Sequence, residues 1–257
     1  MLRSFLAPNP SPMTLTGTRT YVLGERRVIV IDPGSGVASH IDAIAQAVGD
    51  AAVEGVVLTH LHPDHEEGAD ELADRLSAKV LALGRGTLDD GDRIVTDAGD
   101  VIALHAPGHT PDHTVLHWPA GVAVFCGDLM MGGLDTALVA PPEGDLRAYL
   151  TSLAMIGALR PALLHPAHGP SFEDPDSAID MYVRHRRQRL EQVLRAVDAE
   201  AGPMEEIVAR VYGDTIPEAL RGVAAGAVLA YLEYLEAEGR VERRRGGWTL
   251  SAPSTRM

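Results

Sequence analysis

The sequence predicts an α/β protein in which one large domain precedes a smaller, mainly helical one. Short apolar runs typical of strands alternate with segments whose apolar residues recur at helical spacing. A chain of 257 residues can bury a large core and still carry a second unit. That second unit begins around Pro175. We therefore divide the chain into a large domain at 1–174, a linking helix at 175–202 and a C-terminal domain at 203–257.

Strand and helix patterns place the elements of the large domain. Strands are predicted at 20–24, 27–31, 81–83, 101–105 and 115–118. The first two are expected to pair as a hairpin. Ser39 is expected to cap a helix over residues 41–48, and Asp145 to cap one over residues 146–159. Another helix is predicted at 66–76.

A cluster of histidines stands out directly after the apolar run at 56–58. The segment Thr59-His60-Leu61-His62-Pro63-Asp64-His65 holds three histidines and an aspartate within six positions. Neutral imidazoles and a carboxylate suit a divalent metal at the end of a strand better than they suit a core. A metal there lowers the pKa of water enough to make hydroxide near neutral pH, which points to hydrolysis.

Three later segments supply further donors of the same kind, namely His109, Asp128 and His168. Each donor follows an apolar, strand-like run and is accompanied by glycine or proline. One such histidine alone would be typical of an ordinary half-buried residue. Because strand ends are where a sheet scaffold places active-site groups, the repetition favours one shared site.

The order His-x-His-x-Asp-His, Gly-His-Thr, Gly-Asp and a late histidine beside glycine resembles the metallo-β-lactamase superfamily. The resemblance runs from about residue 18 to residue 169 and implies a four-layer αββα sandwich with two metals between its sheets. It implies one metal at His60, His62 and His109, and a second at Asp64, His65 and His168. Asp128 would bridge the two metals.

The chemistry agrees with these assignments. Zinc is the expected metal, as two ions, because it prefers imidazole and carboxylate ligands; iron and manganese are the alternatives. Asp64 is a candidate for orienting the nucleophile while it binds metal. His113 lies four residues after His109 and is a candidate proton donor to the leaving group, or else a packing residue.

At several positions the sequence differs from known branches of the superfamily, and these differences narrow the choice of subfamily. Cys126 lies two residues before the bridging aspartate, whereas true class B1 lactamases carry a cysteine ligand in the second site, so antibiotic hydrolysis is not expected. His62 stands where the diiron flavoprotein branch has glutamate. The single lysine, Lys79, does not match the glutathione site of glyoxalase II.

The composition indicates which partners and which compartment to expect for the protein. The net charge of −14, from 36 acidic and 22 basic residues, opposes non-specific nucleic-acid binding through the bulk surface. No apolar run reaches the roughly 20 residues of a membrane span, so no membrane association is expected. A single cysteine excludes an internal disulfide, and a reducing cytoplasm is the simplest compartment.

The C-terminal part is predicted to contain a long helix at 176–200, then helices at 204–212 and 224–238 and a hairpin at 240–250 with a Gly-Gly turn. The long helix carries a basic stretch, and His185 within it is a candidate substrate contact; its arginines are Arg184, Arg186, Arg187 and Arg189. The order helix, helix, hairpin resembles a small winged-helix module.

Two interpretations of this module remain open. Its hairpin contains Arg243, Arg244 and Arg245, which suits nucleic acid. Its last helix carries Glu233, Glu236 and Glu238, which repel phosphate. If the module does not bind nucleic acid, it would form a wall of the active-site cleft or a homodimer contact.

The whole arrangement resembles the beta-lactamase-like protein 2 subfamily. The leading hypothesis is hydrolysis of a small ester, thioester or related carbonyl substrate, or of a phosphodiester, by a hydroxide that bridges the metals. The alternatives are an endoribonuclease acting on single-stranded RNA and a mononuclear iron persulfide dioxygenase. A small-molecule substrate is the favoured partner, with RNA as the alternative.

Overall fold

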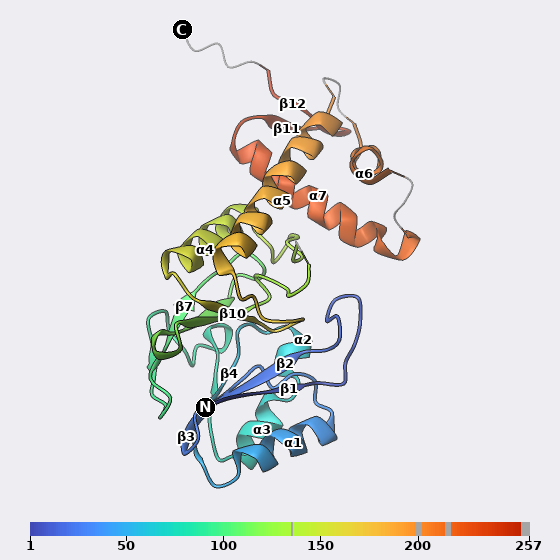
Figure 1. Ribbon diagram of the computed structural model, residues 1–257. Coiled ribbons are helices and arrows are strands. Elements are labelled where there is room, and N and C mark those ends of the chain that lie inside the picture. The colour runs from blue at the N-terminus through green and yellow to red at the C-terminus, as the bar shows by residue number, and fades with distance from the viewer. Residues whose placement is uncertain (135, 199–201, 214–216, 253–257) are drawn as a thin grey trace.

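Two five-stranded sheets face each other, with helices on the outer side of each and a helical unit at the C-terminal end (Figure 1). The computed structural model describes residues 1–134, 136–198, 202–213 and 217–252. The predicted αββα sandwich is therefore confirmed.

The first sheet has the strand order β1-β2-β3-β4-β5. Its strands are β1 (Leu2–Leu6), β2 (Arg19–Leu23), β3 (Arg27–Ile31), β4 (Ala52–Val57) and β5 (Val80–Leu81). The first three pair antiparallel, which confirms the predicted hairpin, and β3, β4 and β5 pair parallel. Helices α1 (Ala38–Val48) and α3 (Ala69–Arg75) cover its outer face.

The second sheet has the order β10-β9-β8-β7-β6. Its strands are β6 (Arg93–Ile94), β7 (Val101–His105), β8 (Thr114–Trp118), β9 (Ala123–Gly127) and β10 (Leu163–Pro166). Only β9 and β10 are parallel. Asp145 accepts a hydrogen bond from the Ala148 amide at 2.6 Å and so caps α4 (Leu146–Ala158), as predicted.

Alternation along the strands explains the layers. In β3, Val28 and Val30 pack outward against the helices, whereas Ile29 and Ile31 pack inward between the sheets. Side chains two apart share a face of a strand, so one apolar strand serves two cores. Phe125 of β9 faces the same inner layer from the opposite sheet.

Two predicted helix starts were wrong. The helix at 38–48 begins before Ser39, because the Val37 carbonyl accepts the amides of His40 and Ile41. The predicted helix at 66–76 is two helices, α2 (Pro63–Glu66) and α3. The break lies at Gly68, whose amide donates to the Gly34 carbonyl at 3.0 Å instead of continuing α2.

One predicted strand is shorter than expected. Strand β5 ends at Leu81, and Leu83 begins the short 3-10 helix η1 (Leu83–Arg85). Two further 3-10 turns are described, η2 (Pro119–Gly121) and η4 (Glu218–Leu220).

The C-terminal domain consists of α6 (Met204–Tyr212), α7 (Arg221–Ala237) and the hairpin of β11 (Val241–Arg244) and β12 (Gly247–Leu250). The turn of this hairpin is Arg245-Gly246 rather than the predicted Gly-Gly pair. Helix α5 (Pro175–Ala196) joins this domain to the sandwich and packs against α4, α6 and α7 (Figure 1). It ends before the predicted residue 200, and residues 199 and 200 lie outside the described chain.

The predicted basic stretch of α5 needs one correction. Arg186 is only 3 % exposed, because it packs under Tyr149 and Tyr231 at the junction of the two domains. Among the described residues, no helix combines the length and the apolar character that crossing a bilayer requires.

Candidate metal centre

The seven predicted donors meet at one edge of the sandwich because strands from both sheets end there. His60 follows β4, Asp128 follows β9 and His168 follows β10. The carboxyl ends of parallel neighbours lie at the same edge, and β9 and β10 are such a pair. His109 comes from the connection between β7 and β8. The structure therefore brings together all seven residues that the sequence had suggested.

One group of donors consists of His60, His62 and His109, whose ligand atoms all lie within 4.8 Å of one another. The Nδ1 atom of His62 lies 3.1 Å from Nε2 of His109. His60 is buried, whereas the side chain of His62 is 31 % exposed. The group is the predicted first metal set.

A second group consists of Asp64, His65 and His168. An Asp64 carboxylate oxygen lies 3.2 Å from Nε2 of His168 and 3.6 Å from Nε2 of His65. Both histidine side chains are fully buried, whereas the Asp64 side chain is 28 % exposed. The group is the predicted second metal set.

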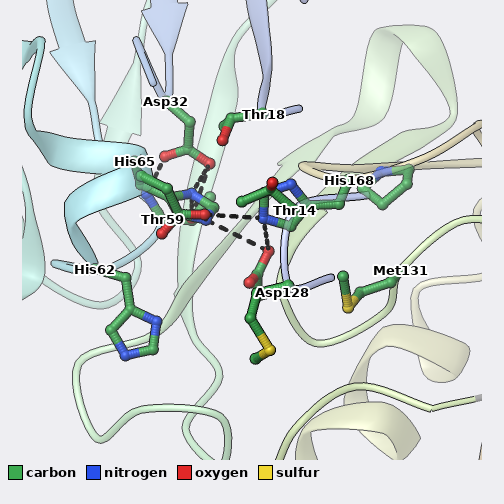
Figure 2. A network of polar contacts seen from close by, with 12 residues as sticks. Thr14, Thr18, Asp32, Thr59, His62, His65, Asp128, Met131 and His168 are labelled. Atoms are coloured by element: carbon green, nitrogen blue, oxygen red, sulfur yellow. Dashed lines mark hydrogen bonds and ion pairs between the residues drawn. The ribbon is translucent and has the colours of Figure 1, made fainter. Parts of the chain in front are cut away.

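Asp128 lies between the two groups. Its Oδ1 atom is 3.4 Å from Nε2 of His65 and 3.2 Å from Nε2 of His168 (Figure 2). Its Oδ2 atom is 3.7 Å from Nε2 of His109. One carboxylate thus offers one oxygen to each group. This is the arrangement that a bridging ligand between two cations requires.

Four of the donor atoms fit cations because hydrogen bonds do not satisfy them. The Nε2 atoms of His60, His65 and His168 and Oδ1 of Asp128 are buried and make no hydrogen bond within the described chain. Buried polar atoms are almost always paired in folded proteins. Four such atoms that converge on one spot, where the only close contacts of Asp128 Oδ1 among the described residues are ion pairs with His65 and His168, fit the ligand set of a divalent metal.

Outer contacts fix most of the histidine rings. His109 Nδ1 lies 2.9 Å from the Leu138 carbonyl, and His168 Nδ1 lies 3.4 Å from the carbonyl of Gly17. His62 Nε2 lies 3.0 Å from a carboxylate oxygen of Glu143. Such partners set the ring orientation and direct the other nitrogen toward the metal.

Asp32 and Thr59 hold the centre of the cluster, and the sequence analysis had not assigned them a role. Asp32 accepts hydrogen bonds from the amide and the hydroxyl of Thr59, both at 2.8 Å, and lies 3.0 Å from Nδ1 of His65 (Figure 2). The Asp-Pro-Gly turn after β3 was the available signal. An aspartate that tolerates its backbone φ of +47° fits this position.

Charge differs between the two groups. Burial lowers the pKa of His60 well below its ordinary value, and burial also lowers that of His109, so both rings are neutral and able to bind a metal. Burial acts in the same direction on His168, but the Asp128 and Asp64 carboxylates outweigh it and raise its pKa to about 9. Without metal, the second group therefore carries a proton that a cation must displace.

His113 is not placed as a proton donor in the cleft. Its ring is fully buried, and its Nε2 atom accepts the backbone amide of Asp128 at 3.1 Å. Burial lowers the pKa of this imidazole well below its ordinary value. The contact corrects the expected role, because it makes His113 a support for the loop that carries the bridging carboxylate.

Comparison with known proteins decides the family. Residues 13–85 and 78–168 match the metallo-beta-lactamase superfamily, and residues 204–248 match the beta-lactamase associated winged helix domain. The chain belongs to the metallo-β-lactamase superfamily. It is a hydrolase of that superfamily with a winged helix domain at its C-terminal end, which confirms the resemblance seen in the sequence.

Relatives of this superfamily member span most of its length. A beta-lactamase-like protein 2 homolog from Caenorhabditis elegans is 31 % identical over 92 % of this chain and 84 % of that protein. An atrochrysone carboxyl ACP thioesterase from Aspergillus chevalieri is 32 % identical over 83 % of this chain and 73 % of that protein. A beta-lactamase domain protein from Burkholderia ambifaria shares the fold, with a TM-score of 0.83, 22 % identity, and coverage of 97 % of this chain and 91 % of that one.

Removing the outer support of His65 should weaken metal binding at the second group. We expect Asp32→Ala to lower metal affinity there by about 10–100-fold, as other outer-partner losses do. Titration against a chromophoric chelator would measure this. Asp97→Ala is the matched control, since Asp97 accepts two backbone amides at 2.8 Å far from the cluster. Equal affinity in both variants would contradict the assignment.

Metal-free and metal-loaded protein should respond oppositely to pH. The pKa of His168 is raised from 6.5 to about 9 on folding, so its proton stabilises the metal-free protein below pH 6.5. That stabilisation is lost as pH rises through about 9. Metal competes with the same proton, so loaded protein should gain stability over this range. Thermal unfolding at pH 6.5, 7.5 and 9, with chelator or zinc, would test this; parallel trends would contradict it.

Proposed function

We propose that the protein is a metal-dependent thioesterase that hydrolyses acyl thioesters with water. The observation that carries this proposal is the Asp128 carboxylate, which faces both donor groups at once. The choice of thioester over other carbonyl substrates is supported by the Aspergillus chevalieri relative, whose name describes a thioesterase.

Zinc suits the donor set of imidazoles and carboxylates. Two such cations would supply a Lewis acid for the carbonyl oxygen and hydroxide near neutral pH. The open side of the cluster lies at Asp64 and His62, whose side chains are 28 % and 31 % exposed, whereas those of His65 and His168 are fully buried. Substrate therefore approaches from the side of Asp64 and His62.

Asp64 is the group that handles the water. Its partly exposed carboxylate accepts a proton from the water that adds to the thioester carbonyl carbon. Collapse of that adduct breaks the carbon–sulfur bond and releases a carboxylic acid and a thiolate, which takes the proton. A thiol has a pKa of about 8.5, so the sulfur leaves without prior protonation. This chemistry needs no acid at the position of the buried His113.

Two of the three hairpin arginines make contacts within the winged helix domain. Arg244 lies 2.5 Å from a carboxylate oxygen of Glu242, and the guanidinium of Arg243 lies 5.5 Å from the centre of the Trp248 ring. RNA cleavage remains a prediction of the sequence, and the substrate panel below includes it.

Replacing Asp64 should impair catalysis while the protein still folds. We expect Asp64→Asn to lower kcat by about 100-fold or more, because the amide cannot accept the proton from water. Steady-state hydrolysis of an N-acetylcysteamine thioester would measure this. Asp70→Asn is the control, since Asp70 is an exposed aspartate that pairs with Arg85. A fully active Asp64→Asn variant would overturn the proposed role.

Metal content and substrate choice can be tested together. Chelation should abolish thioester hydrolysis, and zinc should restore it with two ions per chain by elemental analysis. The loaded protein would be tested on thioester, ester, lactone, phosphodiester and single-stranded RNA substrates. Restoration by iron alone, with one ion per chain and persulfide oxidation, would favour the dioxygenase alternative. RNA cleavage without thioester hydrolysis would favour the nuclease.

A further inference from the structure

A cavity of about 410 Å³ lies between the sandwich and the C-terminal domain, a size suited to a small-molecule ligand. The loop after Asp128, helix α5 and helix α7 wall it. None of the seven metal donors lines it, yet it adjoins them. Leu138 lines it and holds His109 through its carbonyl, and Met131 lies on the His168 side of the donor cluster (Figure 2).

The mouth of this cavity is apolar and exposed. Four large apolar side chains that line it are open to solvent: Met13 at 48 %, Leu134 at 39 %, Leu220 at 42 % and Val223 at 39 %. Isolated exposed apolar residues are ordinary on protein surfaces, but several around one opening mark a binding site. The occupant is therefore largely apolar.

One wall carries a buried positive charge. Arg186 is 3 % exposed; it donates to the Tyr231 hydroxyl at 3.0 Å and to the Ala137 carbonyl, and its guanidinium lies 4.7 Å from the Tyr149 ring centre. Its Nε atom makes no hydrogen bond, and none of its contacts within the described chain is a carboxylate. Buried charges are normally paired, so a guanidinium that contacts no carboxylate among the described residues can pair with an anionic group of a ligand.

The same wall carries a second guanidinium, that of Arg189 on α5. Arg189 and His185 also line the cavity, and the Arg189 guanidinium is oriented over the Tyr212 ring at 4.7 Å. The described residues of the lining include no aspartate or glutamate, although the whole chain has a net charge of −14. This wall is therefore complementary to a negative group on an apolar ligand.

We propose that the cavity binds the acyl part of the substrate, and that this acyl group is bulky, apolar and bears an acidic oxygen such as a carboxylate or phenolate. The apolar walls would hold the carbon skeleton, and Arg186 and Arg189 would bind the acidic oxygen. The thioester end would lie at the metal centre next to Met131. This inference rests on the proposed thioesterase function for the thioester itself, but the binding of the acyl group can be tested separately.

Measurements of thioester turnover test whether the apolar walls of the cavity hold the acyl group. The probes are acetyl and 2-naphthoyl thioesters of N-acetylcysteamine on zinc-loaded, full-length protein. Ala227→Phe, which fills the cavity from α7, should lower the naphthoyl-to-acetyl ratio of kcat/KM by at least about tenfold. Ala225→Phe is the matched control, because Ala225 lines a different hollow beside α6. An unchanged ratio in Ala227→Phe would overturn the proposal.

Measurements of ligand binding, without any catalysis, test whether the arginines of the cavity wall bind an acidic oxygen. Calorimetry would compare 2-naphthoate with its neutral isostere 2-naphthamide. We expect naphthoate to bind at least about tenfold more tightly, and Arg189→Gln to remove that preference while Arg187→Gln, an exposed neighbour on α5, retains it. Arg186→Met is the more direct change but removes a buried contact, so Arg189→Gln decides the question.

The two failures can be told apart. Equal binding of naphthoate and naphthamide, or a preference that survives Arg189→Gln, would overturn the acyl site. If none of the thioesters is hydrolysed while the charge-dependent binding is present, the acyl site stands and the proposed thioesterase function fails.

Discussion

The placement of the Asp128 carboxylate between two sets of buried histidines is the constraint on which the rest of the structure depends. Its two oxygens face different donor groups, and the Nε2 atoms of His65 and His168 beside it make no hydrogen bond within the described chain. Such a cluster is costly to bury unless cations satisfy it. Metal binding is therefore expected to contribute to the stability of this edge of the sandwich as well as to catalysis.

The fold meets this constraint by supplying donors from both sheets. The first sheet contributes the histidine cluster after β4 and the Asp32 support after β3, while the second contributes Asp128 and His168. Neither sheet holds a complete donor set for both metals. The inner apolar layer, which includes Ile31 and Phe125, fixes the two sheets relative to each other, so core packing sets the geometry of the site.

Helix α5 contacts both the loop that follows the bridging Asp128 and the cavity beside the metal centre. Tyr182 on this helix accepts a hydrogen bond from the Met131 amide at 2.7 Å and donates one to its carbonyl at 2.9 Å, which secures the loop that follows Asp128. Arg186 and Arg189, further along the same helix, line the proposed acyl site. One helix thus supports the metal centre and shapes the cavity beside it. If the proposed acyl site is correct, α7 of the C-terminal domain, which lines the same cavity, would take part in substrate selection.

The sequence by itself determined the donors, because residue type and position after a strand are local properties. Alternating and helical periodicities placed most of the strands and helices, and the resemblance to the superfamily implied the four layers. Only the tertiary structure decided how residues far apart in the chain combine. The pairing of Asp32 with His65, the burial of His113 behind Asp128 and that of Arg186 under Tyr149 all depend on packing between distant segments. Ser39 shows the same limit on a smaller scale, because the Val37 carbonyl, rather than the serine side chain, decided where its helix begins.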